Sequence, residues 1–259
     1  MKNGGIRATV LGSGTCVPRK RRASSCVWVR TGESQVLFDT GVGAMRRLVE
    51  AGGSIADITH LCYSHLHPDH TAEFAPFIFA TKYPPHRARQ NSFTVVAGRG
   101  FEEFHQALES AWGDWVMPHK GIMKLKEVSV RRPERVEFPD FSLTTFPMEH
   151  TVQSVGFRLQ TPDGRVLAYT GDTDECEHLL ELAKDADLFF CECSTPDGLK
   201  TEGHLTPSLA GRAAAKAGAR HLILYHLYPE CDQIDPAAQA AAAFDGRITV
   251  AEDLMEFAV

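Results

Sequence analysis

The sequence predicts an α+β fold in which two β-sheets pack face to face and helices cover their outer surfaces, a four-layer αββα sandwich. Short apolar segments with the alternation of strands dominate the early part of each half of the chain, and helical segments follow them. The 259 residues are 43% apolar and 23% charged, the balance of a globular protein. No repeat or low-complexity linker divides the chain, so we expect one domain over residues 1–259, built from two similar halves.

Strands and helices alternate along the first half. Helices are expected over 44–51, 72–80 and 101–112, the last with apolar residues three and four positions apart. The stretch 112–123 mixes aromatic residues with glycine and proline, which predicts an irregular crossing segment. The expected strands of this half cover residues 6–11, 26–29, 36–38, 59–63 and 93–97.

The second half begins with a run of strands and then alternates helix with strand. Pro162-Asp163-Gly164 predicts the turn of a hairpin. Helices are expected over 175–184, 207–217 and 236–244. The expected strands of this half cover residues 125–130, 141–146, 155–160, 166–169, 188–191, 221–225 and 248–250.

The overall charge argues against a protein that holds long nucleic acids by electrostatics alone. The formal net charge is −6, whereas such proteins usually carry a basic excess. Arg19-Lys20-Arg21-Arg22 is a compact cationic run, either a solvated loop or a local basic patch.

Cysteine usage and the N-terminal sequence favour a cytoplasmic protein. Seven cysteines are an odd number without the spacing of a disulfide framework, and we see no secretory leader before the first expected strand. No apolar run approaches the roughly 20 residues that cross a bilayer. We therefore expect no membrane partner.

Four ionisable residues closely follow the expected strand at 59–63: His65, His67, Asp69 and His70. Burying such groups together costs several kcal/mol unless something compensates them, and a divalent metal ion does so directly. Imidazole suits zinc, and a carboxylate adds charge neutralisation. On a tight turn, residues 65 and 67 can face one metal centre, and residues 69 and 70 can face a second one beside it.

Three further polar residues stand where an apolar strand ends: His150, Asp172 and His226. Because each lies where a buried strand emerges, all three can meet the cluster at 65–70 at one edge of a sheet sandwich. Taken together, the seven residues predict a metal site rather than isolated surface residues.

The segment His65-Leu66-His67-Pro68-Asp69-His70 resembles the H-x-H-x-D-H signature of the metallo-β-lactamase superfamily. The resemblance covers nearly the whole chain, from Leu11-Gly12-Ser13-Gly14-Thr15 and Phe38-Asp39-Thr40-Gly41 to His226. The opening 11–18 and Gly203-His204-Leu205-Thr206-Pro207 resemble the ribonuclease Z-like branch in particular. The resemblance implies the four-layer fold of this superfamily.

The resemblance also implies two divalent metal ions, first of all zinc, with manganese or iron as alternatives. Asp39 is implied as a carboxylate that orients a ligand histidine. The implied metal ligands are His65, His67 and His150 on one ion, Asp69, His70 and His226 on the other, and Asp172 as a bridge between them.

The implied chemistry is hydrolysis by a hydroxide that the two ions share. Asp69 is implied as a catalytic residue as well as a ligand. His204 matches the histidine that protonates a leaving alkoxide in the ribonuclease Z-like branch; the alternative is a surface histidine near the start of a helix. Glu192 is expected to hydrogen-bond to His204.

The chain departs from ribonuclease Z enzymes that process tRNA. In one common type, an arm that grips tRNA lies between the third ligand motif and the bridging aspartate, but only 22 positions separate His150 from Asp172 here. Pro68 replaces the glycine of the family signature, and His226-Leu227-Tyr228-Pro229 differs from the usual sequence of that branch. These differences favour a small or cyclic phosphodiester, or an RNA end, as the substrate. The resemblance also allows a homodimer.

The region 82–120 is expected either to face the substrate or to form a packed outer layer. Arg87 and Arg89 could grip a phosphate, and Trp112 and Trp115 could stack on a base or another ring.

Two other functions fit the same residues. The same hydroxide would serve an acyl hydrolase, such as a lactonase or thioesterase. A di-iron redox protein or a non-catalytic metal-binding module is the third hypothesis, although no flavodoxin-like extension follows His226. Gly12-Ser13-Gly14 lacks the third glycine of a dinucleotide fingerprint, and Ser64 lacks a nucleophile elbow.

Overall fold

Two seven-stranded sheets form the centre of the computed structural model, which describes residues 5–259. The first sheet has the strand order β14-β1-β2-β3-β4-β5-β6, with parallel neighbours from β3 to β6 and antiparallel pairs elsewhere. Its strands are β1 (Arg7–Gly12), β2 (Cys26–Thr31), β3 (Ser34–Phe38), β4 (His60–Tyr63), β5 (Phe93–Gly98), β6 (Met123–Val128) and β14 (Glu256–Ala258).

The second sheet has the strand order β13-β12-β11-β10-β9-β8-β7. Neighbours are parallel from β10 to β13 and antiparallel from β7 to β10, and the predicted turn at Pro162-Asp163-Gly164 connects β9 to β10. Its strands are β7 (Glu134–Glu137), β8 (Ser142–Pro147), β9 (Val155–Gln160), β10 (Val166–Tyr169), β11 (Leu188–Glu192), β12 (His221–Tyr225) and β13 (Arg247–Val250).

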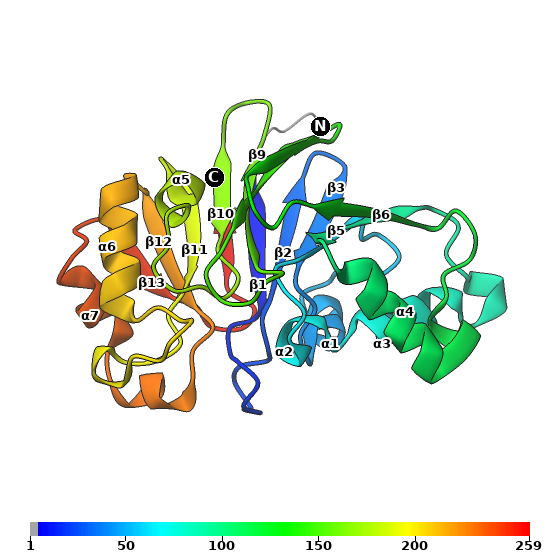
Figure 1. Ribbon diagram of the computed structural model, residues 1–259, viewed down its shortest axis with the longest axis horizontal. Helices are drawn as coiled ribbons and strands as arrows, with labels where there is room; N and C mark the ends of the chain where they lie inside the picture. Colours follow the sequence, from blue (N-terminus) through cyan, green and yellow to red (C-terminus); the bar gives the residue numbers. More distant parts are fainter. Residues whose placement is uncertain (1–4) are drawn as a thin grey trace.

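Helices cover the outer face of each sheet, which confirms the predicted αββα sandwich (Figure 1). Over the second sheet, at the left of the view, lie α5 (Leu179–Ala183), α6 (Pro207–Ala217) and α7 (Pro236–Ala241). On the side of the first sheet lie α1 (Ala44–Glu50), α2 (Pro68–Thr71), α3 (Phe74–Lys82) and α4 (Phe101–Trp112). Short 3₁₀ helices are η1 (Pro85–Arg87), η2 (Gly113–Val116), η3 (Asp197–Leu199) and η4 (Pro229–Gln233). None of the helices described within 5–259 combines the length and the apolar character needed to span a membrane.

Apolar clusters fill the spaces between the layers. The cluster between the two sheets takes side chains from both: Phe38 of β3 stacks on Tyr169 of β10 with ring centroids 5.3 Å apart, and it meets Phe157 of β9 at 5.4 Å. Aromatic side chains bury a large apolar area, so this layer joins the two sheets strongly. Further clusters pack the remaining face of each sheet against its helices.

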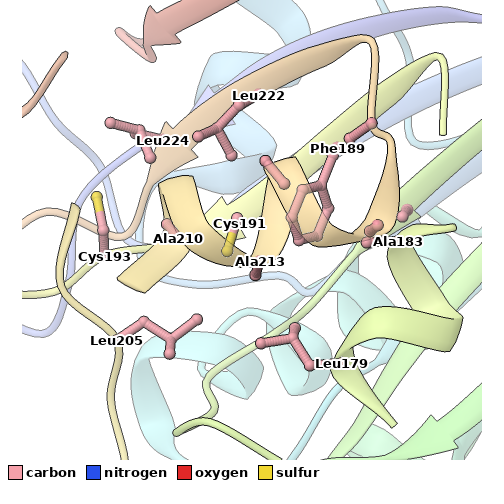
Figure 2. Packing of buried hydrophobic residues seen from close by; sticks show 14 of the residues in the cluster. Leu179, Ala183, Phe189, Cys191, Cys193, Leu205, Ala210, Ala213, Leu222 and Leu224 are labelled. Atoms are coloured by element: carbon pink, nitrogen blue, oxygen red, sulfur yellow. The ribbon is translucent and has the colours of Figure 1, made fainter. Parts of the chain in front are cut away.

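Small residues of α6 let this helix approach the second sheet closely. Ala210 and Ala213 pack in one cluster with Phe189 of β11 and Leu222 of β12 (Figure 2). Gly211 serves the neighbouring helix contact, because a Cβ at this position would lie 2.4 Å from the main-chain oxygen of Ala240 in α7.

Two strands and several helix boundaries differ from the sequence-based prediction. The sequence does not predict β7, because Val136 is its only apolar residue; pairing with β8 makes this segment a strand. It does not predict β14 either, which pairs with β1 from the opposite end of the chain. The expected helix at 72–80 begins at Phe74, after the separate α2, and the expected helices at 175–184 and 236–244 are shorter because turns replace their ends.

Candidate metal centre

The predicted ligands meet at one edge of the sandwich. They follow β4 in the first sheet and β8, β10 and β12 in the second, and these three strands of the second sheet all run in the same direction. Their loops converge so closely that donor atoms from both sheets lie within 4.8 Å of one another. Ligand sites at the carboxyl ends of strands are common in sheets of this kind.

His65, His67, His150 and Asp172 form the first group of donors. His150 Nε2 lies 3.2 Å from His67 Nδ1 and 3.8 Å from Asp172 Oδ2. His65 Nε2 lies 3.8 Å from the same oxygen. The His67 side of this group faces solvent, whereas His65 and Asp172 are buried.

Asp69, His70 and His226 form the second group. His226 Nε2 lies 3.3 Å from His70 Nε2 and 3.5 Å from Asp69 Oδ2. Asp172 reaches this group as well, with Oδ1 3.3 Å from His70 Nε2 and Oδ2 3.4 Å from His226 Nε2. The structure therefore brings all seven predicted ligands together, in the two groups that the resemblance implies.

The donor atoms of both groups fit divalent metal ions. Ligand atoms about 2.0 Å from a tetrahedral zinc ion lie roughly 3.3 Å from one another, and the closest pairs here are 3.2 and 3.3 Å apart. His65 Nε2 and Asp172 Oδ1 are buried and make no hydrogen bond to any residue among 5–259. A buried polar atom without a partner costs about 1–3 kcal/mol. Cations bound to the two groups would compensate both atoms.

The environment favours the metal-binding protonation state at His65 and Asp172, whereas the charges of Asp172 and Asp39 outweigh burial and raise the pKa of His70. Burial lowers the pKa of His65 well below its ordinary value, and nearby His70 adds to the effect. Burial alone would raise the pKa of Asp172, but the charges of His226 and His70 outweigh burial and hold this pKa well below its usual range. Neutral imidazole and ionised carboxylate are the forms that coordinate metals.

Asp39 directly follows β3 and orients the ring of His70 through the nitrogen that does not face the donor cluster. Its Oδ2 pairs with His70 Nδ1 at 2.7 Å and accepts hydrogen bonds from the hydroxyls of Tyr169 at 2.7 Å and Ser64 at 2.8 Å. Its Oδ1 accepts from the Ser64 main-chain N–H. The carboxylate is fully buried and leaves His70 Nε2 directed at the donor cluster. We did not predict Tyr169 or Ser64 from the sequence, where each reads as an ordinary residue beside a strand end.

Other ligand histidines are also held through their second ring nitrogen. His150 Nδ1 lies 2.9 Å from the Gly203 carbonyl, and His226 Nδ1 lies 3.0 Å from Ser194 Oγ. Asp39 and His226 both have a φ of 59°, a conformation that turns the chain sharply at the strand end. Such outer hydrogen bonds fix the orientation of a ligand ring.

His204 lies beside the cluster and contacts Glu192 as expected. Its Nδ1 is 2.9 Å from Glu192 Oε1, 3.0 Å from Ser194 Oγ and 4.0 Å from Asp172 Oδ2. Glu192 is completely buried and also accepts from the main-chain N–H groups of Thr173 and Ser194. Burial alone would lower the pKa of His204, but the hydrogen bond and charge of Glu192 outweigh it and raise this pKa.

The family of the chain follows from a comparison with known families. A family model described as the beta-lactamase superfamily domain matches residues 34–227, a range that contains all seven donors of the cluster. The chain belongs to the beta-lactamase superfamily. This confirms the resemblance noted in the sequence and the prediction of a metal-dependent hydrolase.

Relatives of this superfamily member include an uncharacterized protein of Mycobacterium leprae, 31% identical over 252 residues that cover 94% of this chain and 85% of the relative. The ribonuclease Z of Streptomyces avermitilis is 28% identical, with 96% of each chain covered. Among solved structures, the metallo-beta-lactamase fold protein YhfI of Bacillus subtilis superposes with a TM-score of 0.84 at 23% identity, covering 98% of this chain and 100% of its own. The short form of human tRNase Z gives 0.78 at 20% identity, covering 97% and 98%.

In this beta-lactamase superfamily protein, the expectation that Arg89 could grip a phosphate is wrong. Its guanidinium donates to the main-chain oxygens of Asn91, Ile55 and Ile58 at 2.7, 2.8 and 2.5 Å, and the residue is buried. These bonds occupy the nitrogens that would grip a phosphate. Arg89 therefore fastens the loop before β5 instead of facing the substrate.

The other three residues expected to bind substrate are exposed, and none of them belongs to the donor groups. Arg87 is exposed in η1. Trp112 and Trp115 are 52% and 56% exposed and line a surface pocket of about 390 Å³ that shares no lining residue with the metal centre. Their role in substrate binding stays a prediction.

The cationic run of this superfamily member divides into two pairs. Arg19 and Arg22 both form ion pairs with Asp232, which ties their loop to η4. Lys20 and Arg21 are exposed. The run therefore serves in part to hold the loop after β1 beside the loop that carries His226, where a bridge joins Gly14 to Leu227.

Proposed function

We propose that this chain is a dinuclear-metal phosphodiesterase that acts on a small or cyclic phosphodiester, or on an RNA end. The observation that carries the proposal is the position of His204, which lies beside Asp172 and forms a hydrogen bond with Glu192. A proton donor at this place suits a reaction that releases a poorly leaving alkoxide. The similarity to proteins named ribonuclease Z supports phosphorus rather than acyl carbon as the centre attacked.

In this proposal His65, His67 and His150 would hold one ion and Asp69, His70 and His226 would hold the other, and Asp172, which lies near both groups, would serve both. When bound, two divalent ions, most simply zinc, provide a nucleophile at neutral pH by acidifying water and stabilise charge on the phosphoryl oxygens. The histidine nitrogens and aspartate oxygens of this site favour zinc, and the same atoms can also bind manganese or iron.

The residues of the chain then carry the proton transfers. The carboxylate of Asp69 can accept the proton of the attacking water. His226 and His70 outweigh burial and lower its pKa, which keeps it ionised but makes it a weaker base. As the bond between phosphorus and the leaving oxygen breaks, His204 donates a proton to that oxygen. Glu192 holds the His204 ring in place and stabilises its protonated form.

The size of the chain supports a small substrate over tRNA. The alignment with the Streptomyces ribonuclease Z spans 301 positions, more than the 259 residues of this chain, so that relative carries insertions which are missing here. Between His150 and Asp172 the chain forms only β9, its turn and β10. Seven free cysteine thiols support the cytoplasm as the location within this proposal. A homodimer stays a prediction.

A substrate panel tests the proposal. The zinc-loaded protein is expected to hydrolyse bis(p-nitrophenyl) phosphate and dinucleoside monophosphates, and to act far more slowly on a lactone and a thioester of similar size. Asp172→Asn should abolish the phosphodiesterase activity. Turnover confined to the lactone or the thioester would replace the proposal with an acyl hydrolase, and oxygen-dependent redox activity of iron-loaded protein would replace it with a redox protein.

A further inference from the structure

A buried carboxylate in the C-terminal segment joins three parts of the chain. Asp253 lies between β13 and β14, and its side chain is 3% exposed. Its Oδ1 accepts hydrogen bonds from the main-chain N–H and the hydroxyl of Ser13, at 2.9 and 2.8 Å. Its Oδ2 accepts from the Ala23 main-chain N–H at 2.7 Å and from Arg47 Nε of α1 at 3.1 Å. Asp253 therefore fastens both ends of the loop 13–23, which follows β1, to α1 and to the C-terminal segment.

The loop 13–23 in turn holds the segment that carries the ligand His226. The main-chain oxygen of Ser13 accepts a hydrogen bond from the Leu227 N–H at 3.1 Å. The Arg19 guanidinium donates to the carbonyl oxygen of Leu227. Because Leu227 directly follows His226, these contacts fix the main chain beside this ligand.

The residues that follow the loop contact the other side of the second donor group. The Ser24 N–H donates to the Val42 carbonyl, and the Gly41 N–H donates to the Ser25 carbonyl, both at 3.1 Å. A Cβ at Gly41 would lie 2.1 Å from the main-chain oxygen of Asp69 and 2.6 Å from Ser24 Cβ, so only glycine allows this close approach. The chain at Gly41 is therefore packed directly between the end of the loop and the ligand Asp69.

The second donor group depends on this connection more than the first does. Asp69 follows a strand of the first sheet and His226 follows a strand of the second, and Asp69 Oδ2 lies 3.5 Å from His226 Nε2. Within the described part of the chain, no hydrogen bond joins residues 13–25 to the three histidines of the first group. Ligands of a metal site must be held within about 0.5 Å of their working positions. A displacement of the loop would therefore disturb the second group first.

We propose that Asp253 is a positioning residue for the second metal ion, and that it sets the separation of Asp69 and His226 through the loop 13–23. The inference rests on the proposed function, because it uses the ligand groups assigned there. Each carboxylate oxygen of Asp253 accepts two hydrogen bonds, whereas an amide would turn an N–H₂ group toward two of the donors. The residue lies outside 34–227, the range that the family model matches.

Zinc binding to metal-stripped protein tests the inference without turnover. Calorimetric titration resolves the two zinc ions in the original protein, in Asp253→Asn and in the control Asp187→Asn. Asp187 is also buried, accepts hydrogen bonds from the Val166 N–H at 2.9 Å and from Arg220 Nη1 at 2.7 Å, and precedes β11, at the opposite end of the sheet from the donors. Asp253→Asn should weaken the binding of one zinc ion about ten-fold and leave the other unchanged, and Asp187→Asn should change neither.

A double-mutant cycle identifies the ion that is affected. In Asp69→Asn the second ion has already lost a ligand, so adding Asp253→Asn should cause little further loss. In His67→Asn, which weakens the first ion, the ten-fold effect of Asp253→Asn should remain. The opposite pattern would contradict a path through the loop to the second ion.

Urea unfolding of the metal-stripped proteins separates positioning from stability. Asp253→Asn and Asp187→Asn both disturb hydrogen bonds to a buried carboxylate, so both should lower the free energy of unfolding. Should Asp253→Asn not fold, Ser13→Ala removes one donor to Asp253 and should produce a smaller loss in the same zinc step. Unchanged zinc affinity in whichever of these two variants folds, or an equal loss in Asp187→Asn, would overturn the inference.

The stoichiometry and the activity separate this inference from the proposed function. Fewer than two zinc ions in the original protein would contradict the dinuclear centre and this inference together. Two ions in the original protein, with both affinities unchanged in Asp253→Asn, would contradict only the role of Asp253. Two ions and the expected loss in Asp253→Asn, without hydrolysis of any phosphodiester, would retain the positioning role and contradict the phosphodiesterase.

Discussion

Asp39 illustrates how single residues outside the donor cluster shape it. The sequence could assign Asp39 only through the Phe38-Asp39-Thr40-Gly41 resemblance, whereas the structure shows four hydrogen bonds to its carboxylate. Ser64, Tyr169 and Ser194 could not be predicted, because their roles depend on how the chain turns at the strand ends. The seven donors could be predicted because ionisable residues that cluster at the ends of buried strands need a cation to compensate them.

Replacing Asp39 by asparagine should weaken metal binding. The amide retains the size of the carboxylate but not its charge, and it cannot accept all of the hydrogen bonds that orient His70 and Ser64. We expect the zinc affinity to fall about 10–100-fold. Competition with a chelating dye measures this change, and an unaltered dissociation constant would show that Asp39 does not act on the cluster.

Replacing His204 by alanine should slow the reaction in a way that depends on the leaving group. A nucleoside alkoxide needs a proton, so its release should slow by about 100-fold or more. Release of p-nitrophenolate, which is a stable anion, should change little. Rates for a dinucleoside monophosphate and for bis(p-nitrophenyl) phosphate give the comparison, and an equal loss on both substrates would contradict proton donation by His204.

Individual elements were predictable where their own residues carry the pattern. The apolar strands β10 to β12 and the helix α6 were found with nearly correct bounds from sequence alone. β7 and β14 were not, because β7 has a single apolar residue and β14 has only three residues, and both become strands through pairing with β8 and β1. Arg89 was misassigned for a related reason: only the folded loop shows that three carbonyls surround it.

Replacing Arg89 by alanine should destabilise the protein without affecting catalysis. The loss of its hydrogen bonds leaves buried carbonyls before β4 and β5 without partners, which should cost about 2–4 kcal/mol. Urea unfolding measures the stability, and kcat and KM measure the activity. Arg87→Ala, an exposed change two residues earlier, should alter stability by less than about 0.5 kcal/mol. A raised KM in Arg89→Ala at unchanged stability would restore the expectation of phosphate binding.

His60 at the start of β4 should make folding stability depend on pH. Burial lowers the pKa of His60 to about 4, below the ordinary value near 6.5. Between these pH values the unfolded chain takes up a proton that the folded chain does not, so stability falls as the pH falls from about 6.5 to 4.

His60→Asn should remove about 2 kcal/mol of the difference in unfolding free energy between pH 7 and pH 5. His119→Asn, which changes an exposed histidine, should leave that difference unchanged. Urea unfolding of the three proteins at both pH values makes the comparison. An identical pH dependence in His60→Asn and the original protein would rule out this contribution.

At the scale of the whole molecule, the sequence predicts the layers but not the order of the strands. Alternating and buried segments indicate two sheets with helices outside, which the structure confirms. The order follows from contacts between distant segments: Thr9 pairs with Glu256, and Asp253 accepts hydrogen bonds from both Ser13 and Ala23. These contacts hold the C-terminal segment against the loop beside the metal centre. No local sequence pattern predicts them.

The most direct test of the central claim is a titration of metal-stripped protein with zinc, following hydrolysis of bis(p-nitrophenyl) phosphate as the bound zinc per chain is measured. We expect no hydrolysis in the stripped protein and a rise in rate that ends when each chain holds two zinc ions, as the two donor groups require. Full activity in protein that holds no bound metal would contradict the account.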